Sequence, residues 1–419
     1  MKGAVFVIKK IDERIPNTVG KGTYPDYPAV ASPWGKLYSF HEAAVNSQRN
    51  VAVFSAAVMQ AFRILIPDYE ERAQLLCQFS YDRMYAMFAG PIGKMVGIDA
   101  NNVHPFMAGS FPGALNGDSG DDAQYMPGRV NDFGTYRCEK EIDVCPWDII
   151  GSELCRATTT SLMGVSDGEA TLKKGGPRLD YHMVEARGCG DLHCRIVAES
   201  REKYPMPEHK MWESMGPIAT ADMIKYTPEE EMIKDPQYLR EECGYLFCNG
   251  TCNEQTAAAW FRPNGSSGGA GYLWPFADML IKLGKFTEEE FDRTIHCVLE
   301  AAGKAHFGGF FAVEGARSWL GVPHDVHDGR VMGGYLEVYL GCQGFPYTVE
   351  AFNKDEVILR INRAAMEQRM PRQSKAYISY WYGMTKTLVS AEWSLWEEPD
   401  EAAPDVVRVK IAKKIDKFC

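Results

Sequence analysis

The hexapeptides QLLCQF (residues 74–79) and TIHCVL (residues 294–299) decide the fold of this 419-residue chain, because each places a cysteine at the same point of an apolar segment. The two cysteines are Cys77 and Cys297. Each hexapeptide lies in a stretch whose apolar spacing predicts a helix, and another predicted helix (51–66) precedes the first. The chain therefore contains a helical segment that occurs twice.

Both predicted helices have recognisable start signals. Pro67 comes before the first, and proline at the first helical position followed by acidic residues is typical of a helix start. Thr287 and Glu290 have the spacing of a capping box before the second. Apolar side chains then recur at helical spacing and predict one buried face. They are Phe291, Ile295, Val298 and Ala302.

The correspondence continues after these helices. His104 in NNVHPF and His324 in GVPHDV are separated by the same interval as Cys77 and Cys297, and the interval from VNDF (130–133) to VEAF (349–352) is one residue shorter. Each half continues into a further predicted helix and a closing strand. A similar order at a nearly constant offset indicates a duplication. We predict an α+β fold with two related halves, each a helical hairpin plus an antiparallel sheet with a packed helix.

This repeat predicts four segments along the chain. They are an N-terminal strand and arm (1–50), a cysteine-rich first α+β repeat (51–204), a linker or insertion (205–272) and a second α+β repeat (273–419) with a His/Asp loop and an aromatic helix. The composition, 45% hydrophobic and 24% charged, is that of a globular protein.

Charge and hydropathy exclude several classes of partner. The net charge of −11 and the lack of a basic stripe argue against nucleic acid. The apolar run near the N-terminus is only six residues long, which predicts a strand and neither a secretory signal nor a membrane span. Twelve cysteines without such a signal predict free thiols and a cytoplasmic protein.

The first half carries a cysteine-rich pattern. Cys-Pro at a strand end, a glycine-containing helix, and then GCGDLHC running into a strand (188–197) resemble the L-2-amino-thiazoline-4-carboxylic acid hydrolase-like family. They also resemble small-molecule-binding domains of the 4-vinyl-reductase type. The resemblance covers about residues 50–204 and, more faintly, 275–418. It implies a hydrolase that opens a small ring, or a relative that only binds ligands.

The chain departs from the family pattern at identifiable positions. A family Cys-x-x-Asp falls on GVSD, where Gly164 replaces the cysteine and Asp167 remains, so the resemblance implies a substrate-binding role for Asp167. In the second half, Arg408 aligns with Cys194 and Ala364 with Cys145.

Three cysteines of the first half are candidate metal ligands. Cys189 and Cys194 flank a Gly-Asp turn, and either Cys145, at a strand end, or Cys155 could join them. Thiolates bind zinc, or act as nucleophiles once their pKa is lowered. No CxxC pair is present, and packing alone is the alternative.

The decapeptide GVPHDVHDGR (321–330) is the candidate acid/base site. A histidine oriented by an aspartate is a suitable general base, because its pKa lies near neutral pH. The residues assigned to proton transfer are His324, Asp325, His327 and Asp328, with His104 in the equivalent loop of the first half. The alternative is an exposed polar turn shaped by proline and glycine.

The second half adds an aromatic segment, YISYWYGMTKTLVSAEWSLW (377–396), predicted as one helix. Trp381 and Tyr382 are the candidate wall against which a planar substrate stacks. Aromatic residues at helical spacing are otherwise core residues.

We therefore expect a hydrolase-like enzyme that opens a small cyclic or planar compound by acid/base-assisted attack of water on a C–N or C=N carbon. The first alternative is an isomerase or lyase that uses His/Asp proton transfer. The second is a non-catalytic tandem protein that binds small molecules. The expected partner is a small molecule, without nucleic acid or membrane, and both bound zinc and a homo-oligomer remain open.

Overall fold

The computed structural model describes residues 28–89, 128–133, 137–142, 145, 147–172, 179–200, 270–343, 345–367 and 373–414. Contacts divide the chain into two compact units. Unit 1 comprises Met1–Ala61, Arg262–Pro275 and Thr287–Cys419, and unit 2 comprises Phe62–Phe261 and Phe276–Phe286. The helices α1 (Phe40–Leu65) and α8 (Ala270–Lys282) are each divided between the two units.

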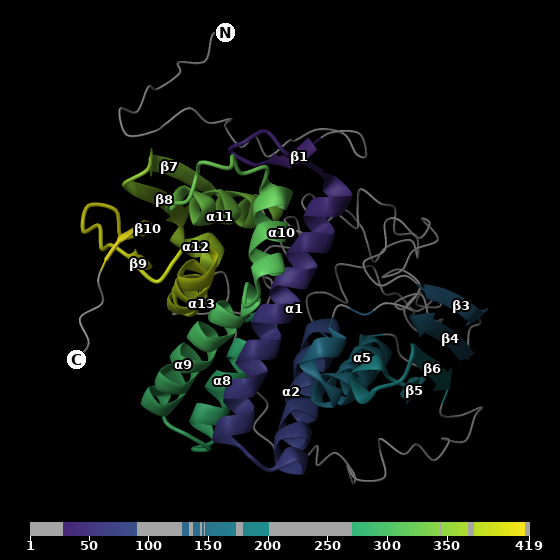
Figure 1. Ribbon diagram of the computed structural model, residues 1–419. Helices are drawn as coiled ribbons and strands as arrows, with labels where there is room; N and C mark the ends of the chain where they lie inside the picture. The colour runs from purple at the N-terminus through teal and green to yellow at the C-terminus, as the bar shows by residue number, and fades with distance from the viewer. Residues whose placement is uncertain are drawn as a thin grey trace. The chain divides into compact units, whose positions relative to one another are not determined.

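Unit 1 is built around a four-stranded antiparallel sheet with strand order β7-β8-β10-β9 (Figure 1). Its strands are β7 (Tyr347–Phe352), β8 (Glu356–Asn362), β9 (Trp393–Glu397) and β10 (Val406–Lys413). Its helices are α9 (Glu288–His306), α10 (Phe310–Leu320), α11 (Arg330–Gln343), α12 (Arg363–Met366) and α13 (Gln373–Leu388). A hairpin of β1 (Pro28–Ala31) and β2 (Leu37–Ser39) packs on α11.

The core of unit 1 is centred on α11, which is buried along its length from Val331 to Gln343. Tyr377 and Trp381 of α13 stack at 5.4 Å between ring centroids and pack with Tyr339 of α11. Phe54 of α1 stacks on Tyr377 at 4.7 Å. These large side chains fill the interior between the helices, which is where aromatic residues contribute most to burial.

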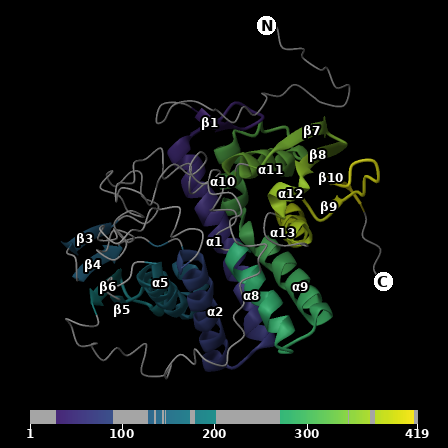
Figure 2. The ribbon, with the colours of Figure 1, turned by 180° about the vertical axis from the view of Figure 1, so that it is seen from behind.

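Unit 2 has a four-stranded antiparallel sheet of order β3-β4-β6-β5, with α5 packed between the sheet and α2 (Figure 2). Its strands are β3 (Gly128–Phe133), β4 (Arg137–Ile142), β5 (Leu179–Glu185) and β6 (Cys194–Ser200). Its helices are α2 (Tyr69–Ala89) and α5 (Ser152–Leu172), with the short 3-10 helices η2 (Asp148–Ile150) and η3 (Arg187–Cys189).

The two sheets have the same topology, which confirms the predicted α+β fold of two related halves. In both, the fourth strand pairs between the second and the third, and a long helix connects the second strand to the third. Both first hairpins also carry an irregularity at the same place, between Val130 and Asp132 in unit 2 and between Val349 and Ala351 in unit 1. A bulge is a specific backbone feature, so its recurrence supports common descent of the halves.

The helix crossings repeat in the same way. A Cβ on Gly164 of α5 would lie 2.4 Å from the carbonyl oxygen of Tyr81 on α2, and one on Gly383 of α13 would lie 2.2 Å from that of Glu300 on α9. The interval from Gly164 to Gly383 equals that from Tyr81 to Glu300, and we call it the crossing offset.

The N-caps of α2 and α9 share the crossing offset. The Asp68 side chain accepts a hydrogen bond from the Glu71 amide, as the Thr287 side chain does from the Glu290 amide. The hairpin irregularities at Val130 and Val349 are separated by the same interval. One offset therefore relates the helix starts, the helix crossings and the first strand hairpins of the two halves.

The crossing offset differs by one residue from the sequence alignment of the cysteines. With this offset, Cys77 corresponds to His296 and not to Cys297. Cys77 is buried and Cys297 is exposed, so the two cysteines do not occupy equivalent positions. The strand ladders likewise pair Ile142 with Cys194 in one sheet and Ile361 with Val407 in the other. The alignment of Cys194 with Arg408 was therefore wrong, and a one-residue slip in a strand moves a side chain to the other face.

Several local predictions need correction. Helix α1 begins at Phe40, inside the segment predicted as a strand and arm, and α2 begins at Tyr69, so Asp68 and not Pro67 starts it. The capping box at Thr287 is confirmed, but Leu299 and Gly303 continue the buried face in place of Val298 and Ala302. The aromatic segment is not one helix, because α13 ends at Leu388 and Trp393 and Trp396 belong to β9.

In the described part of the chain, no helix combines the length and the apolar character that a membrane crossing requires.

Candidate functional site

Four cysteines of unit 2 gather in one corner, formed by the end of β4, the start of α5, η3 and the start of β6. Cys145 and Cys155 pack against the hydrophobic core of the sheet, to which Cys194 belongs, whereas Cys189 is exposed. All four are free thiols. We call Cys145, Cys155, Cys189 and Cys194 the thiol cluster.

A tight turn between β5 and β6 places Cys189 outside and Cys194 inside. The Cys189 amide donates to the Ala186 carbonyl at 2.9 Å, and the Asp191 carboxylate accepts from the Ala186 amide at 2.7 Å. Gly190 has a φ of 101°, a left-handed conformation that glycine adopts without strain. The turn also lies against α5, because a Cβ on Gly188 would be 2.5 Å from the sulfur of Cys155.

The cluster is made of two hydrogen-bonded thiol pairs. The hydrogen bond from Cys155 lowers the pKa of Cys189 to about 7, and that from Cys145 lowers the pKa of Cys194 to about 7. The Arg187 amide also donates to the Cys194 sulfur at 3.3 Å. The pKa values of Cys145 and Cys155 are raised, because each thiol keeps the proton that it donates. One sulfur of each pair is therefore the thiolate near neutral pH, and only Cys189 is exposed.

A buried ion network holds the start of α5 beneath the cluster. The Glu153 carboxylate accepts from Arg63 at 2.9 Å and from Arg72 at 2.8 Å, and its side chain is 3% exposed. Burial by itself raises the pKa of Glu153, but the hydrogen bonds from the two guanidinium groups outweigh it and lower the pKa to about 2. The network fixes the helix that carries Cys155.

A histidine and a carboxylate form an ion pair at the start of β6, where His193 directly precedes Cys194 in the chain. His193 follows Cys189 on the turn into β6, and its Nε2 lies 2.7 Å from the Glu185 carboxylate. Both side chains are partly exposed, at 35% and 37%. A carboxylate that orients an imidazole is a common arrangement in acid/base catalysis. The motif GCGDLHC contains His193, but only the β5–β6 pairing brings Glu185 to it.

The predicted zinc site is not found among the described residues. There, no three histidine, cysteine, aspartate or glutamate side chains are arranged to hold a metal ion. The thiols hydrogen-bond in pairs, Cys145 with Cys194 and Cys155 with Cys189. The three predicted ligands Cys145, Cys189 and Cys194 thus belong to two different pairs.

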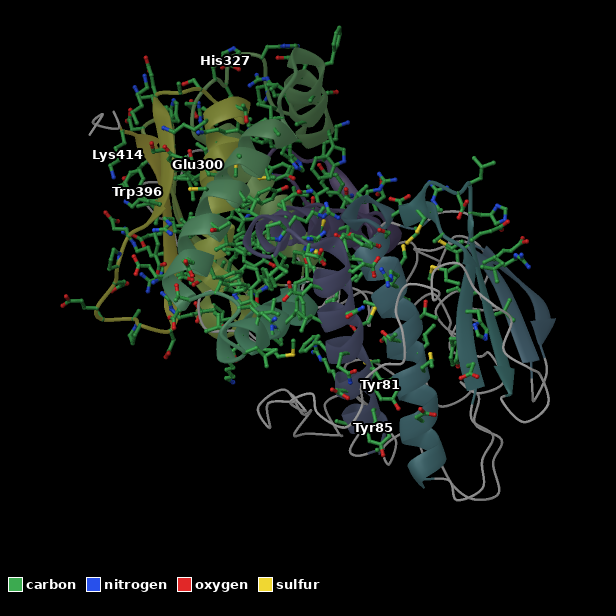
Figure 3. All side chains as sticks on the ribbon, turned by 90° about the horizontal axis from the view of Figure 1, so that it is seen from below. Tyr81, Tyr85, Glu300, His327, Trp396 and Lys414 are labelled. Atoms are coloured by element: carbon green, nitrogen blue, oxygen red, sulfur yellow. The ribbon has the colours of Figure 1, made fainter. Side chains whose placement is uncertain are left out.

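The His/Asp loop lies in unit 1, between α10 and α11. His324, Asp325 and His327 are exposed, and Figure 3 shows His327 at the outer edge of the unit. The Asp328 carboxylate accepts from the Arg330 guanidinium at 2.7 Å and from the Arg330 amide at 3.0 Å, which starts α11. This arrangement matches the alternative of an exposed polar turn. His104 lies outside the described residues.

The structure separates the two predicted stacking residues. Trp381 is 0% exposed and lies in the core, whereas Tyr382 lines an open pocket of about 280 Å³. Asp167 of α5 accepts a hydrogen bond from the Tyr81 hydroxyl on α2 at 2.7 Å, so it ties two helices together.

Comparisons with protein-family models, with curated proteins and with solved structures find no match to this chain.

Proposed function

We propose that this protein is a small-molecule hydrolase in which the Cys189 thiolate attacks a C–N or C=N carbon of a small cyclic compound. The observation that carries the proposal is the thiol pair at the turn, where an exposed Cys189 is hydrogen-bonded to Cys155 and has a pKa of about 7. A thiolate is the reactive form of cysteine, and an exposed one with a lowered pKa has the properties of a nucleophile. The substrate class rests on the resemblance of GCGDLHC and its flanking segments to the thiazoline hydrolases.

The reaction proceeds in two balanced steps. The Cys189 sulfur adds to the carbon of the cyclic amidine, and the C=N electron pair moves to the exocyclic nitrogen. That pair re-forms the C=N bond as the ring C–N single bond breaks; the ring nitrogen keeps the electron pair of the broken bond and takes a proton from His193. Water then attacks the carbon bound to sulfur, one water proton goes to His193 and the other to the imine nitrogen, and the Cys189 thiolate leaves as the C=O bond forms. Glu185 orients the imidazole in both steps. This reaction replaces the exposed His/Asp loop by the thiol cluster as the site of chemistry.

The second half of the chain supports the choice of the thiol cluster as the reactive site, because it has the same fold but not the corresponding cysteines. With the crossing offset, Ala364 corresponds to Cys145 and Ser374 to Cys155. Val407 occupies the ladder position of Cys194. The Ser374 hydroxyl donates a hydrogen bond to the Glu367 carboxylate. The thiol chemistry is therefore assigned to unit 2.

Loss of the Cys189 sulfur is expected to abolish turnover. With L-2-amino-thiazoline-4-carboxylate as substrate, Cys189→Ser should lower kcat by roughly a hundredfold or more, because a serine hydroxyl is almost entirely protonated at neutral pH. Mass spectrometry of the ring-opened product, heavier than the substrate by one water, measures the rate. Cys297→Ser, which removes an exposed thiol of unit 1, is the matched control and should leave kcat unchanged. Equal turnover by Cys189→Ser and wild type contradicts the proposal, as does no turnover by wild type of this and related cyclic C=N compounds.

Removal of the hydrogen-bond donor is expected to slow alkylation of Cys189. In Cys155→Ala the pKa of Cys189 should rise from about 7 toward the ordinary value of 9.0. The thiolate fraction at pH 7 then falls by about fiftyfold, but a more basic thiolate is more nucleophilic, so the net loss is roughly fivefold. The rate of iodoacetamide labelling of the Cys189 peptide, followed from pH 5.5 to 10, gives both quantities. An unchanged titration midpoint would show that Cys155 does not act on Cys189.

A further inference from the structure

The pocket of about 280 Å³ in unit 1 is separate from the thiol chemistry of unit 2. It is formed by α9, α13, β9 and the residue after β10, and Glu300, Trp396 and Lys414 lie together there in Figure 3. Tyr382 and Trp396 supply aromatic surface, and His296 and Ser379 supply polar atoms. The volume is slightly below the range of about 300–1,000 Å³ for small-molecule sites, which suits a compound with a single ring.

The charges at the pocket favour an anion. Lys414 lies over the Trp396 ring, with its Nζ 4.8 Å from the ring centroid, and the structure pairs it with no carboxylate among the described residues. The other charges near the pocket are mixed in sign, and Asp292 and Lys375 act on the pKa of His296 in opposite directions. Glu300 forms an ion pair with Lys304 at 2.5 Å, and the Nζ of Lys386 donates to Ser394 at 2.9 Å. A carboxylate of the ligand would therefore find Lys414 as its partner.

His296 adds a hydrogen-bond acceptor. Burial lowers the pKa of His296 below its ordinary value, so the ring is neutral at neutral pH. Its Nδ1 is hydrogen-bonded to the Ser379 hydroxyl, and that hydroxyl donates to the Lys375 carbonyl at 3.1 Å. With the Ser379 proton on the Lys375 carbonyl, the neutral tautomer that fits both contacts carries its proton on Nδ1 and its lone pair on Nε2. A ring N–H can donate to it.

In unit 2, the position that corresponds to this pocket is filled by side chains. With the crossing offset, His296 and Ser379 correspond to Cys77 and Thr160, which are 1% and 0% exposed. The Thr160 hydroxyl donates to the Cys77 carbonyl at 2.9 Å, so the interior between the two helices is filled there. The repeat thus carries a filled interior in one half and a pocket with aromatic, cationic and imidazole groups in the other.

We propose that this pocket binds a single-ring heteroaromatic carboxylate, with its ring against Tyr382 and Trp396, its carboxylate at Lys414 and a ring N–H at His296. Binding here does not depend on the reaction proposed for Cys189. An aromatic face, a cation and an acceptor at fixed places select a planar anion over an aliphatic or uncharged compound.

The probe for this site is pyrrole-2-carboxylate, titrated into the full chain by isothermal titration calorimetry. Binding is expected, and pyrrole-2-carboxamide, which has the same shape without the charge, should bind at least tenfold more weakly. Lys414→Gln should weaken binding of the carboxylate at least tenfold. Lys413→Gln is the matched control, because Lys413 is the adjacent residue and pairs at the surface with Glu392, and its affinity should equal that of wild type.

Further measurements keep the two proposals distinguishable. Cys189→Ser should bind pyrrole-2-carboxylate as wild type does, even where it has lost turnover. Tyr382→Leu should weaken binding of the carboxylate and the carboxamide alike, because it removes only ring stacking. The inference is overturned if carboxylate and carboxamide bind equally, if Lys414→Gln binds as Lys413→Gln does, or if no heat of binding appears at millimolar probe.

Discussion

Gly383→Ala is expected to destabilise the protein by about 2 kcal/mol. A Cβ at this position would lie 2.2 Å from the carbonyl oxygen of Glu300 and 2.8 Å from the amide nitrogen of Lys304. Both are backbone atoms of α9, so no side chain can rotate away and the two helices must separate. Overpacking of this kind costs about 1–3 kcal/mol or more and outweighs the gain of about 1 kcal/mol that alanine brings to a helix.

The matched control for this substitution is Gly315→Ala in α10. Nothing lies within 4 Å of a Cβ on Gly315, so only the helix propensity changes and the protein should be stabilised by about 0.5–1 kcal/mol. Urea unfolding followed by circular dichroism measures both variants. Opposite signs support close contact of α9 and α13 at Gly383. Stabilisation by Gly383→Ala equal to that by Gly315→Ala would contradict the crossing.

Glu153→Gln is expected to destabilise unit 2 by about 3 kcal/mol at pH 7. The carboxylate lies between Arg63 and Arg72 and is almost fully buried. Breaking a buried ion pair leaves a charge without compensation, which costs about 3–5 kcal/mol, and the partial exposure of Arg63 places the expected loss at the lower end. Glu71→Gln, which removes an exposed pair with Lys285 in the same unit, is the control and should change stability by less than about 1 kcal/mol.

The pH dependence of this effect has a definite sign. The pKa of Glu153 in the folded protein is lowered from 4.5 to about 2. The unfolded chain therefore takes up the proton first as pH falls, and the stabilisation is fully present above about pH 4.5 and lost toward pH 2. The difference in free energy of unfolding between wild type and Glu153→Gln should shrink over this window. A difference that stays constant from pH 6 to pH 3 would exclude the carboxylate as its source.

The candidate site could be predicted only in part from the sequence. GCGDLHC directed attention to Cys189 and Cys194, and both lie in the thiol cluster. The prediction of three metal ligands did not anticipate the pairing of Cys155 with Cys189. Cys155 is distant from Cys189 along the chain, and it becomes a hydrogen-bond donor only because Gly188 lets the turn approach the start of α5.

The His/Asp loop shows the opposite case. A dense group of chemically capable residues, His324 to Asp328, lies in an exposed turn where Asp328 serves to start α11.

The pocket of unit 1 contains Tyr382 from the predicted aromatic wall, but Lys414, Trp396 and His296 come from three other parts of the chain. No spacing along the chain indicates that these residues meet.

The sequence by itself determined what depends on neighbours along the chain: the α+β class, the repeated order of helices and strands, and the capping box at Thr287. Only the tertiary structure decided the crossing offset between the halves, the partner of each thiol and the residues of the pocket. The physical reason is that strand ladders and glycine crossings join backbone atoms of distant segments. A shift of one residue in a strand reverses which face a side chain occupies, while the local pattern that predicts the strand stays the same.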